Sequence, residues 1–172
     1  MERKQWLAVY SKPRWEKKVH RLLTEKGIES YCPLNKISRQ WSDRIKIVEE
    51  PLFKSYVFVK INDEERTAVR MTNGVVNFVY WQGKPALIKD KEIKTIKKFL
   101  NDYENIEVKQ TALHVGSRVT IEQGILMDKS GLVKRVLNNK VEVLIDSLGF
   151  KLIAVVDKKK LSPLNGNNIL PK

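Results

Sequence analysis

The chain has 172 residues, of which 42% are hydrophobic, and its formal net charge is +13. This length and composition predict one packed domain or two small ones, and they exclude a disordered tail. No apolar run approaches the roughly 20 residues of a membrane-spanning helix, so no membrane association is expected. The first residues contain no apolar signal segment, and we therefore expect a cytoplasmic protein.

The basic residues are spread over both halves of the chain. Such an excess indicates nucleic acid or another acidic partner, although a soluble and merely basic surface gives the same composition. Cys32 is the only cysteine, and the two histidines lie far apart in the sequence. These counts support neither a structural metal site nor a nucleophilic catalytic group, so we expect no metal, no cofactor and no enzyme activity.

The spacing of hydrophobic residues separates strands, where they alternate, from helices, where they recur every three to four residues. In chain order this spacing predicts a strand at 6–10, a helix at 14–26, a strand at 28–34, a hairpin at 35–48, a strand at 51–61, a helix up to Met71, a strand at 75–81 and a helix from Asp90. This order predicts an α+β domain with helices against a mainly antiparallel sheet.

The strand at 51–61 is expected to be central in that sheet, because it is rich in aromatic and β-branched residues. Side chains alternate along a strand, so Val57 and Val59 share one face while Tyr56 and Phe58 share the other. The aliphatic face is suited to packing against helices. The aromatic face is typical of a two-sided core or of a surface that binds another protein.

The second half changes character after residue 101. Polar residues without a period predict a linker, and short strands at 118–122, 132–137, 140–145 and 152–156 alternate with glycine or asparagine turns. Regular short strands of this kind predict a small all-β barrel. We therefore expect an N-terminal domain at 1–102, a linker at 103–115, a barrel at 116–164 and a flexible tail at 165–172.

Four motifs in this order resemble the NusG family of transcription elongation factors, in which an NGN domain precedes a KOW domain. They are the opening with Trp6, Tyr10, Pro13 and Glu16, the strand at 51–59, the strand at 74–79, and the glycine-punctuated barrel. Phe58 after the tyrosine, and the segment 85–88 after Phe78 and Val79, are more similar to the specialised paralogues RfaH and UpxY than to the general factor.

The resemblance implies three sets of contact residues. The positions that match the apolar patch for the clamp helices of the largest RNA polymerase subunit are Tyr10, Tyr56, Phe58 and Trp81. The positions on the side of the polymerase gate loop are Glu65, Arg66 and Thr67, although they do not match the threonine-rich sequence of RfaH. The positions that would meet the non-template single DNA strand are Lys12, Arg14, Lys17, Lys18, Arg21, Thr72 and Asn73.

In the barrel, Leu148 and Phe150 lie in the loop that the family presents to a ribosomal protein or a termination factor. RfaH holds its C-terminal domain as a helical hairpin on the polymerase-binding patch, which raises autoinhibition as an alternative. The β-branched residues between 133 and 145 favour strands instead, and we expect a barrel in the resting state and a monomeric protein.

The function implied is transcription elongation and antitermination by a factor that suppresses pausing, serves selected operons and holds polymerase by binding energy alone. The alternative is a KOW-containing RNA-binding protein of ribosomal type. An aromatic patch on an open sheet face distinguishes the two, because only a polymerase-binding protein needs one.

Overall fold

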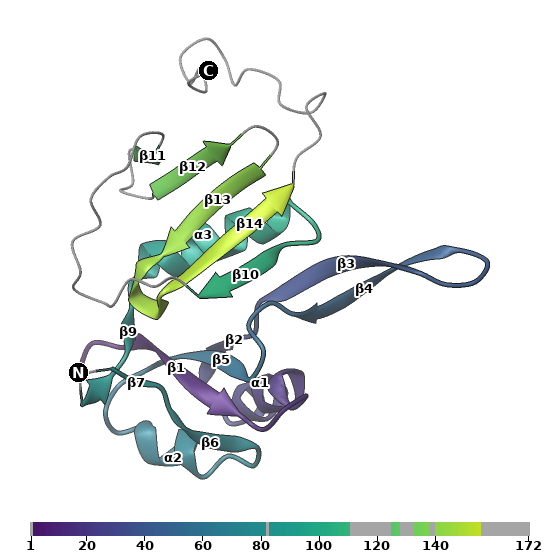
Figure 1. Ribbon diagram of the computed structural model, residues 1–172. Coiled ribbons are helices and arrows are strands. Elements are labelled where there is room, and N and C mark those ends of the chain that lie inside the picture. The colour runs from purple at the N-terminus through teal and green to yellow at the C-terminus, as the bar shows by residue number, and fades with distance from the viewer. Residues whose placement is uncertain (1, 82, 111–124, 128–132, 138–139, 156–172) are drawn as a thin grey trace.

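The computed structural model describes residues 2–81, 83–110, 125–127, 133–137 and 140–155 (Figure 1). The expected strand at 118–122 and the expected tail at 165–172 lie outside these residues. No helix in the described part is both long and apolar enough to span a membrane.

The N-terminal sheet is built on the antiparallel pair of β1 (Gln5–Ser11) and β5 (Tyr56–Ile61). β2 (Glu29–Tyr31) lies on the outer side of β5, and the other side of β1 is shared by β6 (Val75–Phe78) and β9 (Leu87–Ile88). The expected central position is confirmed for Tyr56–Ile61, because β5 has a hydrogen-bonded strand on each side. The expected strand begins later than at 51, since Pro51 ends β4 and 52–55 form the connection to β5.

Two helices, α1 (Glu16–Glu25) and α2 (Arg66–Arg70), cover one face of this sheet. Their buried residues and those of the strands form one cluster. Its members are Leu7, Val9, Val19, Leu23, Ile28, Val57, Val59, Ile61, Val69 and Phe78. The aliphatic face predicted from alternation therefore packs against helices, as expected.

The opposite face of the sheet is covered by α3 (Asp90–Asp102) and by residues of the C-terminal strands. Trp6, Ala8 and Phe58 lie in one cluster with the apolar stripe of α3. That stripe is formed by Ile93, Ile96 and Phe99. The sheet is thus buried on both faces over most of its area, which explains why its strands are hydrophobic on both sides.

The expected hairpin is formed by β3 (Leu34–Gln40) and β4 (Ile45–Pro51). The two strands pair antiparallel from the Leu34–Pro51 pair to the Gln40–Ile45 pair. It projects away from both sheets as a two-stranded arm (Figure 1).

The strand expected at 75–81 is interrupted at Val79. Its first part is β6, and its last part is β7 (Tyr80–Trp81), which pairs with β8 (Lys84–Pro85) in a separate ribbon. The interruption arises because the Val79 N–H donates to the Ala8 carbonyl at 2.8 Å, while the Val79 carbonyl accepts from Ala86 at 2.8 Å. A hydrophobic run alone does not reveal such a change of partner.

The C-terminal strands form a second antiparallel sheet. The β-branched residues of this region therefore lie in strands and not in a helical hairpin. Its order is β10 (Glu107–Gln110), β14 (Phe150–Val155), β13 (Lys140–Ile145), β12 (Val133–Leu137) and β11 (Ile125–Met127). A short 3-10 turn, η1 (Asp146–Leu148), joins β13 to β14. The segment expected as a linker at 103–115 thus contributes the edge strand β10, which pairs with β14.

Gly74 provides a test of the packing between α1 and the turn before β6. Its φ is +91°, and an added Cβ would lie 2.5 Å from Cε3 of Trp15 and 2.8 Å from Cγ2 of Val19. We expect Gly74→Ala to lower the free energy of unfolding by about 2–4 kcal/mol, because backbone strain adds to overpacking.

The matched control is Gly27→Ala. Gly27 also has a positive φ, +75°, but nothing lies within 4 Å of a Cβ built there. Gly27→Ala should lower the free energy of unfolding by about 1 kcal/mol, because only the strain of a positive φ is added. The free energies of both variants are measured by urea unfolding. Equal losses for the two variants would contradict the packing argument.

Candidate functional site

Two tyrosines from the central strand pair form the most exposed aromatic surface of the N-terminal sheet. Tyr10 on β1 lies directly opposite Tyr56 on β5, and their ring centroids are 5.0 Å apart. Tyr10 is 38% exposed and Tyr56 is half-buried. Neighbouring strands therefore present these two expected site residues as one aromatic pair.

The C-terminal sheet reaches this pair through Phe150. The Phe150 ring meets Tyr56 edge-on at 5.6 Å and lies 5.4 Å from the Phe53 ring. Phe150 is only 8% exposed. The family resemblance implies that Phe150 lies in a loop facing an external partner. In the structure Phe150 begins β14 and covers part of the aromatic surface. Leu148, in the turn before β14, is half-buried nearby.

A groove of about 490 Å³ remains beside this contact. It is lined by Phe53 and Tyr56 from the N-terminal sheet region, by Val108 and Phe150 from the C-terminal sheet, and by Ile37 from the arm. The cover over Tyr56 is therefore partial, and one side of the ring lines an open groove.

The expected exposure of Phe58 is wrong. Phe58 is 0% exposed, and its ring is packed against Phe53 at 5.7 Å and Tyr31 at 6.4 Å. It shares a face with Tyr56 as predicted, but it lies further from the end of the sheet, where α3 closes over it. Phe58 is a core residue and not part of an accessible patch.

Trp81 is half-buried on β7 and packs against the same cluster as Phe58. Within the described part of the chain its ring makes no contact with the rings of Tyr10 or Tyr56, and its Nε1 has no hydrogen-bond partner. The structure therefore joins Tyr10 and Tyr56 but leaves Trp81 apart from them.

A buried carboxylate holds the C-terminal sheet against α3. Glu92 is 4% exposed and accepts hydrogen bonds from the Ser147 N–H at 3.0 Å and from the Ser147 hydroxyl. The same carboxylate accepts the Lys89 N–H at 3.0 Å, which caps the start of α3. The side chain that caps α3 is thus that of Glu92, the third residue of the helix.

A second connection joins β3 to the segment between α3 and β10. The Asn35 side chain donates to the Ile106 carbonyl at 2.8 Å and accepts its N–H at 3.1 Å, so it acts as a strand partner. Asn105 donates its N–H to the Lys36 carbonyl at 2.8 Å. These bonds fix where β10, and hence β14 beside it, leaves the N-terminal domain.

The second expected surface is the basic face of α1 and of the turn before it. Lys12, Arg14, Lys17, Lys18 and Arg21 are all exposed. The half-buried Trp15 organises this surface, since the Lys18 ammonium lies 4.0 Å and the Lys12 ammonium 5.3 Å from its ring centre. An aromatic ring flanked by cations is chemistry that suits a nucleic-acid strand.

Two members of the expected nucleic-acid set are engaged within the protein. Thr72 is 2% exposed, donates to the Ala68 carbonyl at 2.9 Å and accepts from the Lys26 ammonium at 2.9 Å, so the expectation that it meets DNA is wrong. Lys17 donates to the Glu49 carbonyl at 2.8 Å, which ties α1 to the arm. Asn73 is exposed.

The three residues expected on the gate-loop side begin α2. Glu65 accepts from the Lys4 ammonium at 2.8 Å and exchanges hydrogen bonds with Asn62, and the Lys4 contact lowers the pKa of its carboxyl. Thr67 is exposed.

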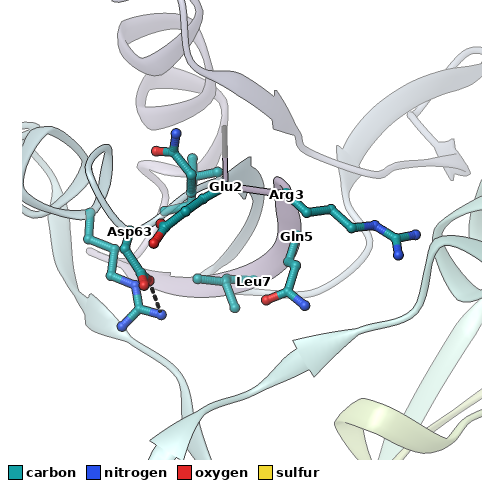
Figure 2. A pocket seen from close by; sticks show the side chains of 8 residues that line it. Glu2, Arg3, Gln5, Leu7 and Asp63 are labelled. Carbon is teal, nitrogen blue, oxygen red and sulfur yellow. Dashed lines mark ion pairs between the residues drawn. The ribbon is translucent and has the colours of Figure 1, made fainter.

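Arg66 pairs with Asp63 at 2.6 Å. Figure 2 shows this ion pair beside a small pocket of about 210 Å³, which is also lined by Glu2, Arg3 and Leu7. Its two acidic and two basic side chains largely compensate one another.

Sequence reasoning missed Phe53, Glu92 and Asn35. Phe53 was visible only as part of the motif at 51–59. Glu92 had a usable signal, since an acid at the third position of a helix is the second half of a capping box. Asn35 had none, because its partner Ile106 is 71 residues away.

The fold and the site together define a two-part binding protein: an α+β domain with an aromatic surface and a basic helix, followed by an antiparallel β-sheet that touches the aromatic surface. A family model described as "Transcription termination factor nusG" matches residues 4–97, more than half of the chain. The chain therefore belongs to the NusG family, which comprises transcription factors and not enzymes.

Curated relatives agree with this assignment, and each is named "Transcription termination/antitermination protein NusG". The protein of Streptococcus pyogenes serotype M1 is 28% identical over 176 residues, covering 94% of this chain and 97% of its own. The Chlamydia trachomatis serovar D protein is 33% identical over 97 residues, covering 55% and 53%.

Two solved structures are also similar. The first, from a study of domain interaction in Thermotoga maritima NusG, is 21% identical with a TM-score of 0.49 and covers 89% of this chain and 93% of that chain. The second, a chain of the MjSpt4:Spt5 complex, is 16% identical with a TM-score of 0.32 and covers 87% and 99%.

The Tyr10–Tyr56 pair predicts a pH dependence of stability. Burial, and then the hydrogen bond with Tyr10, raise the pKa of Tyr56 above its ordinary value of 10.0. The unfolded chain therefore releases this proton at lower pH than the folded protein does. The stabilisation is complete below pH 10 and is lost as the pH rises toward the folded pKa. We expect the free energy of unfolding to fall above pH 10.

The variant Tyr56→Phe, which has no phenolic proton, should show a shallower fall in urea titrations between pH 9 and 11. Comparing variants removes the background from lysines and from Tyr31, whose pKa burial raises to about 12. Identical slopes for wild type and Tyr56→Phe would contradict the assignment.

Proposed function

We propose that this chain is a transcription elongation and antitermination factor that binds the clamp helices of RNA polymerase through the Tyr10–Tyr56 surface. The observation that carries the proposal is the pairing of these two rings at the open end of a sheet that lies within the residues matched by the family model. Tyrosine supplies a large apolar ring with a polar tip, which suits a protein interface. Phe58 belongs to the core cluster against which both Tyr56 and Trp81 pack.

The proposed mechanism is a shift of population without a chemical step. A factor that binds the active conformation of polymerase more tightly than the paused one moves the equilibrium toward elongation by that difference in affinity. Glu65, Arg66 and Thr67 would form the second contact, on the gate-loop side. Their bonds to Lys4 and Asp63 leave Thr67 as the most accessible of the three.

Polymerase binding would compete with the C-terminal sheet. Phe150 contacts Tyr56 edge-on, and Glu92 holds the neighbouring turn through Ser147. If only the uncovered form binds, the apparent affinity is reduced by the fraction of molecules that are uncovered. Release would also expose Phe150 and Leu148, which are the proposed contacts of the C-terminal domain with a ribosomal protein or termination factor.

Two features support a specialised paralogue that serves selected operons. Phe58 fills the core beneath the tyrosine pair, and the segment 85–88 contributes β9 beside β1. Both belong to the motifs that are more similar to RfaH and UpxY than to the general factor.

The basic surface around Trp15 would hold the non-template DNA strand. Lys12 and Lys18 flank the ring, and Arg14 precedes it. Lys17 contributes less, because its ammonium already donates to Glu49. Arg21 lies 3.8 Å from Glu25, an exposed pair whose stabilisation is small, so Arg21 remains available to a phosphate.

The polymerase contact is tested with core RNA polymerase and three variants of the full chain. We expect Tyr56→Ala to weaken binding about 30-fold, the effect of losing an anchor worth about 2 kcal/mol. Phe150→Ala should instead bind several-fold tighter, because it removes the cover. Tyr80→Ala removes an exposed tyrosine elsewhere and should bind as wild type does. Equal affinities for Tyr56→Ala and wild type would exclude this surface.

The DNA contact is tested by the salt dependence of binding to a single-stranded oligonucleotide. Removing both cations beside Trp15 in Lys12→Ala/Lys18→Ala should reduce the slope of log K against log salt by about 1.4, or 0.7 per lost phosphate contact. The control Lys94→Ala/Lys98→Ala makes the same charge change on the exposed side of α3. A control that lowers the slope equally would show a general charge effect and no specific surface.

A further inference from the structure

The arm formed by β3 and β4 carries exposed side chains that neither the fold nor the proposed function uses. It projects away from both sheets (Figure 1), and every residue from 38 to 47 is exposed. Three of these residues are large and hydrophobic. Trp41 is 55% exposed, Ile45 is 68% exposed and Ile47 is 56% exposed.

Strand register divides these residues between two faces. Residues that lie opposite each other in an antiparallel pair point to the same face. Ser38 faces Ile47 and Gln40 faces Ile45, so this face carries no charge near the tip, whereas toward the base it continues to the pair of Lys36 and Glu49.

The other face combines an aromatic ring with cations. Arg39 faces Lys46, and the pairing continues to Trp41, whose N–H donates to the Arg44 carbonyl at 2.8 Å. The Lys46 ammonium lies 5.9 Å from the centre of the Trp41 ring. The hairpin register thus places Trp41 on the same face as Arg39, Arg44 and Lys46.

The charges on this face are only partly compensated. Arg39 is paired with Glu50, its Nε donating to that carboxylate at 2.9 Å. In the part of the chain that the structure describes, Arg44 and Lys46 have no carboxylate within ion-pair distance. The tip of the arm therefore presents two unpaired cations on the same face as an exposed indole ring.

We propose that this face of the arm binds single-stranded nucleic acid, with an unpaired base stacked on Trp41 and its flanking phosphates on Arg44 and Lys46. Every base can stack on an indole, and cations beside the ring attract the backbone, so such a platform binds strands with little sequence preference. A protein partner would favour the opposite face, where Ile45 and Ile47 are exposed. The aromatic face has the charge that complements phosphate.

The proposed platform is separate from the basic surface around Trp15. That surface is formed by α1 and the turn before it, whereas Trp41 lies at the tip of the arm. A hydrogen bond from Lys17 to the Glu49 carbonyl joins the two at the base of the arm, away from its tip. Each can therefore be removed without changing the residues of the other.

The test is fluorescence anisotropy of the full chain with labelled 12-nucleotide single strands of DNA and RNA, and with a duplex of the same sequence. We expect Trp41→Ala to weaken single-strand binding about tenfold, a typical loss for one stacked base, and Trp41→Phe to retain most of the affinity. Arg44→Ala/Lys46→Ala should reduce the salt slope by about 1.4. The matched control, Ile47→Ala, changes a residue of the opposite face that is 56% exposed, against 55% for Trp41, and should alter affinity less than twofold.

Three results would overturn the proposal: an unchanged affinity for Trp41→Ala, an equal loss for Ile47→Ala, or a loss confined to the duplex. The second result would indicate a general apolar surface, and the third a groove-binding arm. Preference for RNA or for DNA identifies the strand and supports the proposal in either case. If Lys12→Ala/Lys18→Ala weakened single-strand binding but Trp41→Ala did not, the proposed function would stand and only the proposed arm site would be excluded.

Discussion

The structure depends on the register between β1 and β5. Leu7 lies opposite Val59 and turns toward α1 and α2, whereas Tyr10 lies opposite Tyr56 and turns toward α3 and the C-terminal sheet. A slip of β5 by one residue would move Tyr56 into the core beneath α1, away from Tyr10, and bring the aliphatic side chains of β5 to the other face. The same hydrogen bonds that hold the sheet therefore also assemble its aromatic surface.

That surface is the uncovered end of a hydrophobic core. On the sheet face that turns toward α3, two cross-strand pairs follow one another along β1 and β5. The first, Ala8 and Phe58, is fully buried, and the second, Tyr10 and Tyr56, is partly exposed. The stripe of α3 closes the first pair, and Phe150 of β14 reaches Tyr56 of the second. Under the proposed function, the cover and a polymerase helix would use the same ring, so the interaction that stabilises the free protein would oppose binding. The proposal therefore links stability and function at Tyr56.

Charge shows the same difference between local and tertiary information. The helical spacing of α1 correctly placed Lys18 and Arg21 on an exposed face. It could not show that Lys17 reaches Glu49 or that Thr72 accepts from Lys26, because those partners lie 32 and 46 residues away. Long-range hydrogen bonds decide which polar side chains remain available to a ligand, and no periodic pattern records them.

The sequence alone determined the order of the main elements from β1 to α3, the central strand, the two faces of β5 and the family, since each follows from local alternation or from motifs within one stretch of chain. It also determined that the C-terminal segments are strands, through their β-branched residues. It did not reveal the break at Val79 or the strand β10. Only the tertiary structure decided that Phe58 is core while Tyr56 stays accessible, and that Phe150 covers it. Alternation assigns Tyr56 and Phe58 the same face, and what separates them is packing by α3 and β14, which lie far along the chain.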